Sequence, residues 1–128
     1  MQTPALTAGL LLVLTGLVHS VLGEILIFRQ VRERGIVPTR APSPLKERHL
    51  RILWATWHVV TLLGWGFAAL LLRIGAQPDA PLATLLLTVT AATSGAAGVL
   101  VLFATRARHP GWIALTLAGT LAGIAAAS

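Results

Sequence analysis

The chain contains no cysteine, which excludes disulfide bonds, thiolate metal sites and cysteine nucleophiles. Only four of its 128 residues are acidic. The sequence also contains no recognisable hydrolase triad, no nucleotide-binding glycine loop and no pair of carboxylates. General acid–base chemistry would therefore depend on His19, His58 and Glu24, and the sequence alone does not decide whether the protein is an enzyme.

Charged residues of both signs are scarce, at 11% of the chain, whereas hydrophobic residues make up 55% and the mean hydropathy is +0.80. Ordinary soluble domains carry about 25% charged residues, so this composition indicates a membrane protein. A transmembrane helix uses about 20 residues, so about four spans with short links fit into the chain. We therefore expect a single transmembrane domain over residues 1–128 and no separate soluble domain.

Proline and small polar residues mark the expected helix starts. Thr3-Pro4, Ser43-Pro44 and Pro110 are favourable starts, because a hydroxyl caps the first turn and proline lacks an N–H that this turn leaves unpaired. The predicted spans cover about 4–28, 50–72, 81–105 and 111–127. The last has only about 17 apolar residues, the lower limit for crossing, so a half-inserted segment is the alternative. The expected fold is an all-α integral membrane four-helix bundle with antiparallel up-and-down topology.

The basic residues are sorted to one side of this expected topology. Only Arg73 falls in the middle loop, while the other nine fall in or beside the first and third loops: Arg29, Arg32, Arg34, Arg40, Lys46, Arg48, Arg51, Arg106 and Arg108. By the positive-inside rule, both basic loops are cytoplasmic and both termini lie outside, in a multi-pass protein of the bacterial inner (plasma) membrane. The expected partners are the lipid bilayer and anionic lipid headgroups at these loops. Nucleic acid is not an expected partner, because no nucleic-acid-binding module accompanies the positive charge.

Small residues recur along the expected spans. Gly9, Gly16 and Gly23 share one stripe of the first span, and Gly119 and Gly123 have GxxxG spacing in the last. Small residues allow membrane helices to approach closely and gain packing contacts. The pattern predicts helix packing, and it leaves open whether the helices pack within one chain, in a homo-oligomer or against a partner in a membrane complex.

Two histidines lie within long apolar runs, and an ionisable residue in a membrane span is a candidate functional site. His19 is nine residues before Phe28, about 13 Å from the end of its span, and His58 is about 12 Å into the next span. The two spans are antiparallel, so the two imidazoles can face each other. Glu24 lies about 140° around the helix from His19, so we expect it outside this site and paired with Arg51 near the membrane surface.

The residues expected beside the two histidines suggest a binding site. Gly16 and Gly23 leave room next to His19, while Trp54, Thr61 and Trp65 share the face of His58. Four interpretations remain open: a structural pair of hydrogen-bonded histidines, a bis-histidine cofactor site for haem b, a non-haem metal site at His19 and His58, and a proton or solute path. Trp54 is equally compatible with an anchor at the membrane interface.

Two short motifs carry a resemblance to known proteins. His19-Ser20-Val21-Leu22-Gly23-Glu24 in the first span and Trp57-His58-Val59-Val60-Thr61 in the second resemble a group of small, uncharacterised bacterial inner-membrane proteins. The resemblance covers about half the chain and implies a four-span α-helical protein with no assigned activity. The Arg-x-x-x-Asn-x-x-Glu pattern of small four-span enzymes that conjugate glutathione to lipids is not present after the first loop.

These observations predict a small four-span inner-membrane protein with a buried His19/His58 site that binds haem or a metal in a redox role. Two alternatives stay open: a non-catalytic structural or assembly subunit of a membrane complex, and a proton-linked small-solute transporter. The sequence identifies neither the ligand nor the oligomeric state.

Overall fold

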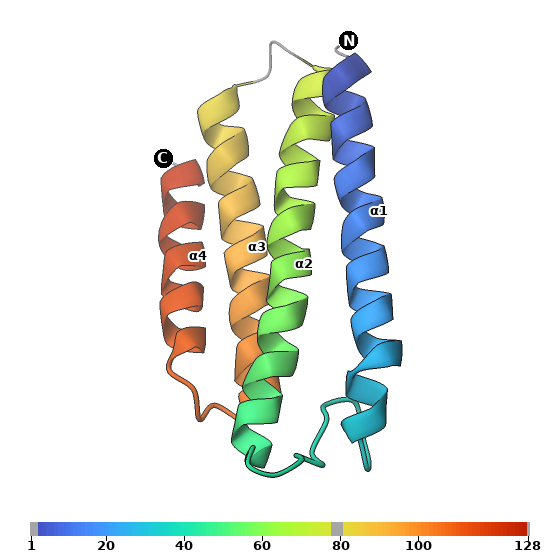
Figure 1. Cartoon of the computed structure of the whole chain (residues 1–128). Helices are drawn as coiled ribbons and strands as arrows, with labels where there is room; N and C mark the ends of the chain where they lie inside the picture. Colours follow the sequence, from blue (N-terminus) through green and yellow to red (C-terminus); the bar gives the residue numbers. More distant parts are fainter. Residues whose placement is uncertain (1–2, 78–80, 128) are drawn as a thin grey trace.

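The chain folds into four long helices, which a computed structural model describes for residues 3–77 and 81–127 (Figure 1). They are α1 (Thr3–Leu26), α2 (Glu47–Ala76), α3 (Leu82–Thr105) and α4 (Gly111–Ala127), and the short 3-10 helix η1 (Phe28–Val31) follows α1. Successive helices run in opposite directions, and the described residues contain no strand. The predicted all-α, four-helix architecture is confirmed.

The start of α2 differs from the prediction. The helix begins at Glu47 rather than at Ser43-Pro44, which lies in a turn closed by a bond from Leu45 N–H to the Pro42 carbonyl (2.8 Å). His49 supplies a cap instead, because its Nδ1 accepts a hydrogen bond from the Lys46 backbone N–H (3.3 Å). An imidazole nitrogen can satisfy an unpaired N–H at a helix start in the way that a hydroxyl oxygen does.

The helices are arranged so that each packs against its neighbour in sequence. α1 packs on α2, α2 on α3, and α3 on α4, and no other pair of the four packs closely along its length within the described ranges. The link between α1 and α2 folds back under the helices at the end where η1 lies (Figure 1). The only extensive neighbour of α1 in the described chain is therefore α2.

The tightly packed core is small and lies near the end of the molecule that carries the basic loops. Its buried residues come from η1, the first link, α2 and α3: Phe28, Val37, Trp54, Ala55, Val101 and Ala104. Elsewhere many large apolar side chains are exposed, such as Leu10, Phe67 and Leu121. Helices that are apolar on their outward faces are typical of proteins surrounded by lipid.

Three helical segments are long and apolar enough to cross a membrane, namely α1 with η1, α2 and α3, whereas α4 is shorter.

Several glycines lie at contacts between helices of this chain. A Cβ at Gly119 would lie 2.9 Å from the Gly95 nitrogen and 3.0 Å from the Ala91 carbonyl oxygen, so the backbones of α3 and α4 touch there. Gly9 likewise meets Leu72, and Gly66 meets Thr93.

Candidate functional site

Polar side chains meet between α1 and α2, within otherwise apolar helices. Ser20 of α1 bonds to His58 Nδ1 (2.9 Å) and to the Thr61 hydroxyl (2.8 Å), both on α2. The Thr61 hydroxyl also donates to the Gly16 carbonyl (3.4 Å). Ser20 therefore joins His58 and Thr61 across the helix interface, although it was not among the predicted site residues.

Glu24 belongs to this cluster. Its Oε2 accepts a hydrogen bond from the Trp54 indole N–H (3.2 Å) and lies 3.9 Å from His58 Nε2. Its Oε1 forms an ion pair with Arg32, which follows η1 in the first link. The expectation that Glu24 lies outside the histidine site was wrong, because the long carboxylate side chain reaches α2 from the edge of the interface.

The predicted ion pair between Glu24 and Arg51 was also wrong. Arg51 is buried, and its guanidinium donates to Glu47 of its own helix (2.7 Å) and to the Ala104 carbonyl of α3 (3.0 Å). Arg32 takes the place beside Glu24, because the chain turns back after η1 and returns this arginine to the end of α1.

His19 has a different environment from His58. Its ring stacks on the Trp57 indole, with the ring centroids 4.3 Å apart and the planes inclined by 6°. Trp57 also donates its indole N–H to the His19 carbonyl (3.0 Å). Trp57, the stacking partner of His19, precedes His58 in the sequence, and the Trp-His dipeptide is the nearest sequence signal for this role.

The room expected beside the histidines is filled by tryptophan side chains. A Cβ at Gly16 would lie 2.5 Å from Trp65 Nε1, and one at Gly23 would overlap Trp57 Nε1. Trp65 also donates to the Val13 carbonyl (3.1 Å), which fixes its indole against α1. A flat haem macrocycle needs this space, so the residues present do not fit a bis-histidine haem.

A metal site is not supported either. The described part of the chain contains no group of three or more His, Asp or Glu side chains placed to hold a metal ion. Two histidines alone leave a metal ion short of ligands, and Ser20 already occupies Nδ1 of His58. We therefore derive no metal or redox chemistry from His19 and His58.

Trp54 lies within the cluster rather than at its edge. Its side chain is buried, donates to Glu24, and lies edge-on to the His58 ring with centroids 4.7 Å apart and planes inclined by 67°. Trp54 therefore lies against His58, as one of its two predicted roles requires. Trp65 is partly exposed and contacts α1 rather than either histidine ring.

The cluster forms a polar line from the middle of α2 to the first link, through Thr61, Ser20, His58, Glu24 and Arg32. His19 Nε2 and His58 Nε2 are buried and have no hydrogen-bond partner among the described residues. With His58 neutral, the formal charges of Glu24 and Arg32 cancel. The arrangement therefore has one buried nitrogen, next to a carboxylate, that can accept a proton.

Comparisons with known proteins give no relative from which a role can be transferred. No protein-family model matches the chain, and no curated protein or solved structure is significantly similar to it.

Proposed function

We propose that this is a multi-pass protein of the bacterial inner membrane that binds a proton at His58 and Glu24, as part of proton-linked transport of a small solute. Membrane insertion is supported by the apolar outward faces of the helices and by three helical segments of sufficient length. The positive-inside rule then places the two basic loops in the cytoplasm and the N-terminus outside. A reporter fused within residues 30–45 tests this orientation, and a periplasmic signal would overturn it.

The observation that carries the proton-binding proposal is the 3.9 Å gap between His58 Nε2 and Glu24 Oε2. The gap is too long for a hydrogen bond, and the nitrogen is buried without another partner in the described chain. A proton on His58 makes both ring nitrogens donors, so Nε2 then attracts the Glu24 carboxylate. A buried charge needs a partner, and Glu24 is the carboxylate within reach.

Protonation of His58 also changes the pairing of Arg32. Glu24 is shared between the two cations, so a stronger contact with His58 weakens its ion pair with Arg32. Arg32 belongs to the first link, whose conformation is thereby coupled to the proton bound between α1 and α2. A transporter requires such coupling between a protonation step and a movement of the chain.

Proton flux into liposomes that contain the purified protein tests this function. We expect His58→Gln and Glu24→Gln to reduce flux driven by an imposed pH gradient at least about tenfold, because each removes a proton-binding group. His49→Gln is the matched control, because His49 lies at the start of α2 and bonds only to Lys46 and Arg48 in the described structure. Equal flux in all three variants and the wild type would refute the proposal.

A spectroscopic titration tests proton binding without requiring transport. Trp54 contacts both Glu24 and His58, and a protonated imidazole quenches a neighbouring indole. We expect a fluorescence decrease on acidification that is smaller in His58→Gln than in the wild type and of wild-type size in His49→Gln. A titration that is unchanged by His58→Gln would place the proton elsewhere.

A second candidate is a non-catalytic subunit of a membrane complex. It is supported by the exposed apolar face of α1, including Leu10, Leu14 and Val18, which no other part of the described chain covers. Gentle detergent extraction followed by native gel electrophoresis separates the two candidates. Recovery of the protein alone and monomeric would count against a subunit role.

A further inference from the structure

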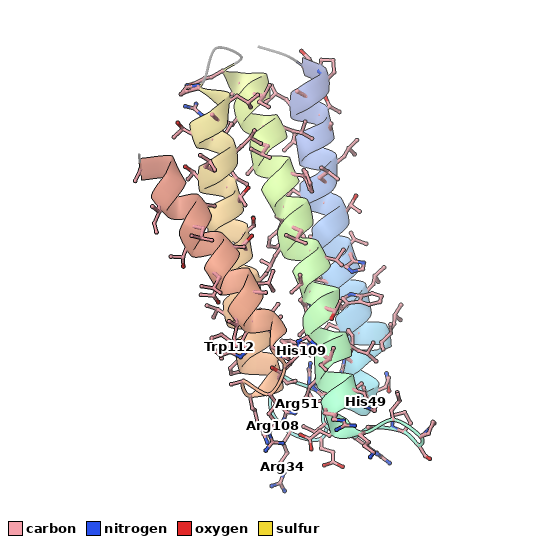
Figure 2. The ribbon with its side chains drawn as sticks, turned by 90° about the vertical axis from the view of Figure 1, so that its left-hand side faces the viewer. Arg34, His49, Arg51, Arg108, His109 and Trp112 are labelled. Atoms are coloured by element: carbon pink, nitrogen blue, oxygen red, sulfur yellow. The ribbon has the colours of Figure 1, made fainter. Side chains whose placement is uncertain are left out.

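A second polar region lies away from the α1–α2 site, at the end of the molecule where α2 begins and α3 ends. A cavity of about 320 Å³ opens there, and its charged lining contains four arginines and one carboxylate: Arg48, Arg51, Arg106, Arg108 and Glu47. Figure 2 shows Arg51, Arg108 and His109 near one another at this end. The excess of positive charge suits an anionic group.

The arginines come from two sides of the cavity. Arg51 is held by Glu47 and by the Ala104 carbonyl, so its guanidinium is fixed before any ligand arrives. The pKa of Glu47 is lowered, first by the hydrogen bond from Arg51 and also by the charges of Arg106 and Arg108. The positive field of the α3–α4 link therefore reaches across the cavity to α2.

The backbone of this link is strained at the cavity. Arg106 and Ala107 are consecutive non-glycine residues with left-handed conformations, at φ values of 52° and 60°. Such conformations are unfavourable for residues with a Cβ, and here they belong to the end of α3, where the Ala107 N–H donates to the Leu102 carbonyl (2.9 Å). Here they end α3 and direct the chain past the cavity, with Arg106 and Arg108 in its lining.

An apolar groove of about 170 Å³ adjoins the basic cavity. The two share Ile52, Thr105 and His109 in their linings. Beyond these residues the groove is lined by Thr56, Gly111 and apolar side chains of α2, α3 and α4: Ala55, Val59, Val101 and Leu115. A charged cavity that continues into an apolar groove fits a molecule with an anionic head and a hydrocarbon chain.

We propose that the cavity and the groove together bind one anionic phospholipid, with its phosphate among Arg48, Arg106 and Arg108 and one acyl chain along Val59 and Leu115. Guanidinium groups bind phosphate through paired charge-assisted hydrogen bonds. The groove selects a lipid over a soluble phosphate, because a soluble anion leaves these apolar walls uncovered. The proposal rests on the membrane insertion proposed above and is independent of proton binding at His58.

Native mass spectrometry of the detergent-purified full chain tests the site with phosphatidylglycerol and phosphatidylcholine of identical acyl chains. We expect one tightly bound phosphatidylglycerol, and at least about tenfold weaker binding of it by Arg106→Gln/Arg108→Gln. The matched control is Arg29→Gln/Arg40→Gln, which removes the same charge from exposed positions outside the cavity lining. Equal loss in both double variants would overturn the site in favour of general attraction.

Two tryptophan substitutions on α2 test whether the groove binds the acyl chain. Thr56→Trp places a large side chain in the groove, whereas Val60→Trp places it on an exposed face of the same helix. We expect only Thr56→Trp to weaken phosphatidylglycerol binding. Binding of glycerol phosphate as tight as that of phosphatidylglycerol, or an equal effect of both tryptophans, would overturn the assignment to a lipid.

Membrane insertion and lipid binding at the cavity are tested by separate measurements. Alkaline carbonate extraction of membranes reports insertion, and release of the protein by this treatment would contradict membrane insertion. A protein that resists extraction but binds both lipids equally would contradict only the lipid site.

Discussion

The α1–α2 interface and the α3–α4 interface bring their two helices together through different contacts. Between α1 and α2, glycines of one helix receive tryptophan side chains of the other, and Ser20, Trp57 and Trp65 bond across the gap. Between α3 and α4, glycine lets the backbones touch, as at Gly119. The first interface is polar and specific, whereas the second is apolar and close.

Thr61 differs from several other threonines of the chain. Thr61 of α2 bonds to α1, whereas threonines on all four helices donate to a carbonyl four residues earlier in their own helix, among them Thr7, Thr56, Thr93 and Thr120. A hydroxyl bonded within its own helix contributes no link to its neighbour. The hydroxyl links between helices therefore lie at the α1–α2 interface, whereas the basic cavity lies where α2 begins and α3 ends.

The greatest loss of stability is expected from a substitution that breaks the backbone contact between α3 and α4. A Cβ at Gly119 meets backbone atoms of Ala91 and Gly95, which no side-chain rotation can move aside. We expect Gly119→Ala to lower the free energy of unfolding by about 3 kcal/mol, as overpacking of a tight interface does. Chemical denaturation in detergent measures this.

Gly95→Ala is the matched control, since a Cβ at Gly95 meets nothing within 4 Å. Because alanine favours the helix, this variant should be neutral or more stable by up to about 1 kcal/mol. Similar losses in the two variants would show that the Gly119 contact does not hold the helices together.

A smaller effect is expected at the tryptophan-filled interface. Gly23→Ala forces the Trp57 indole away from α1, which breaks its hydrogen bond to the His19 carbonyl and its stacking on the His19 ring. We expect a loss of about 2 kcal/mol, because the indole can relocate while a backbone cannot. Thermal unfolding followed by near-ultraviolet circular dichroism reports both stability and the tryptophan environment.

Gly64→Ala on α2 serves as its control, because nothing lies within 4 Å of a Cβ there. A loss for Gly64→Ala as large as that for Gly23→Ala would mean that glycine at these helix positions matters for reasons other than the fit of Trp57.

Two hydroxyl groups, one on α1 and one on α4, differ in their expected contribution to stability. Ser20→Ala removes bonds to both His58 and Thr61, so we expect a loss of about 1 kcal/mol. Thr120→Ala removes only a bond within α4 and should change stability by less than about 0.5 kcal/mol. Equal losses, measured by denaturation under the same conditions, would contradict the division between a polar and an apolar interface.

The smallest effect concerns pH at the start of α2. Arg51 lowers the pKa of Glu47 below its ordinary value of 4.5, so ionised Glu47 stabilises the fold above that pH. The stabilisation is lost as the pH falls through the lowered pKa, because protonation weakens the bond to Arg51. We expect Glu47→Gln to show a slightly smaller fall in melting temperature than the wild type between about pH 6 and about pH 3. Parallel curves for the two proteins would contradict this.

The helices could be predicted from the sequence because long apolar runs bounded by proline, glycine and charged residues are typical of transmembrane helices. The helix bounds agree to within a few residues, and the α2 start was missed because the cap is a histidine rather than the hydroxyl of Ser43. Which helix packs against which could not be predicted, since an apolar face alone does not specify the helix that it contacts.

The site was predicted in part. Its position between α1 and α2 follows from antiparallel neighbours and helical rise, but Glu24 was misplaced by the arithmetic of helix faces. His19 and Glu24 lie on opposite flanks of the stripe that contains Gly16 and Ser20, each within about 80° of its centre. A helix packed on that stripe contacts both flanks, so two residues 140° apart belong to one interface.

The order of packing has a consequence for how the protein is made. Because α2, α3 and α4 each pack against the helix that precedes them, a packing partner has already been synthesised when each of them emerges. Contacts between sequence neighbours also require little loop closure, which favours fast folding. The fold can therefore assemble in the direction of translation, beginning with the α1–α2 pair and its polar cluster.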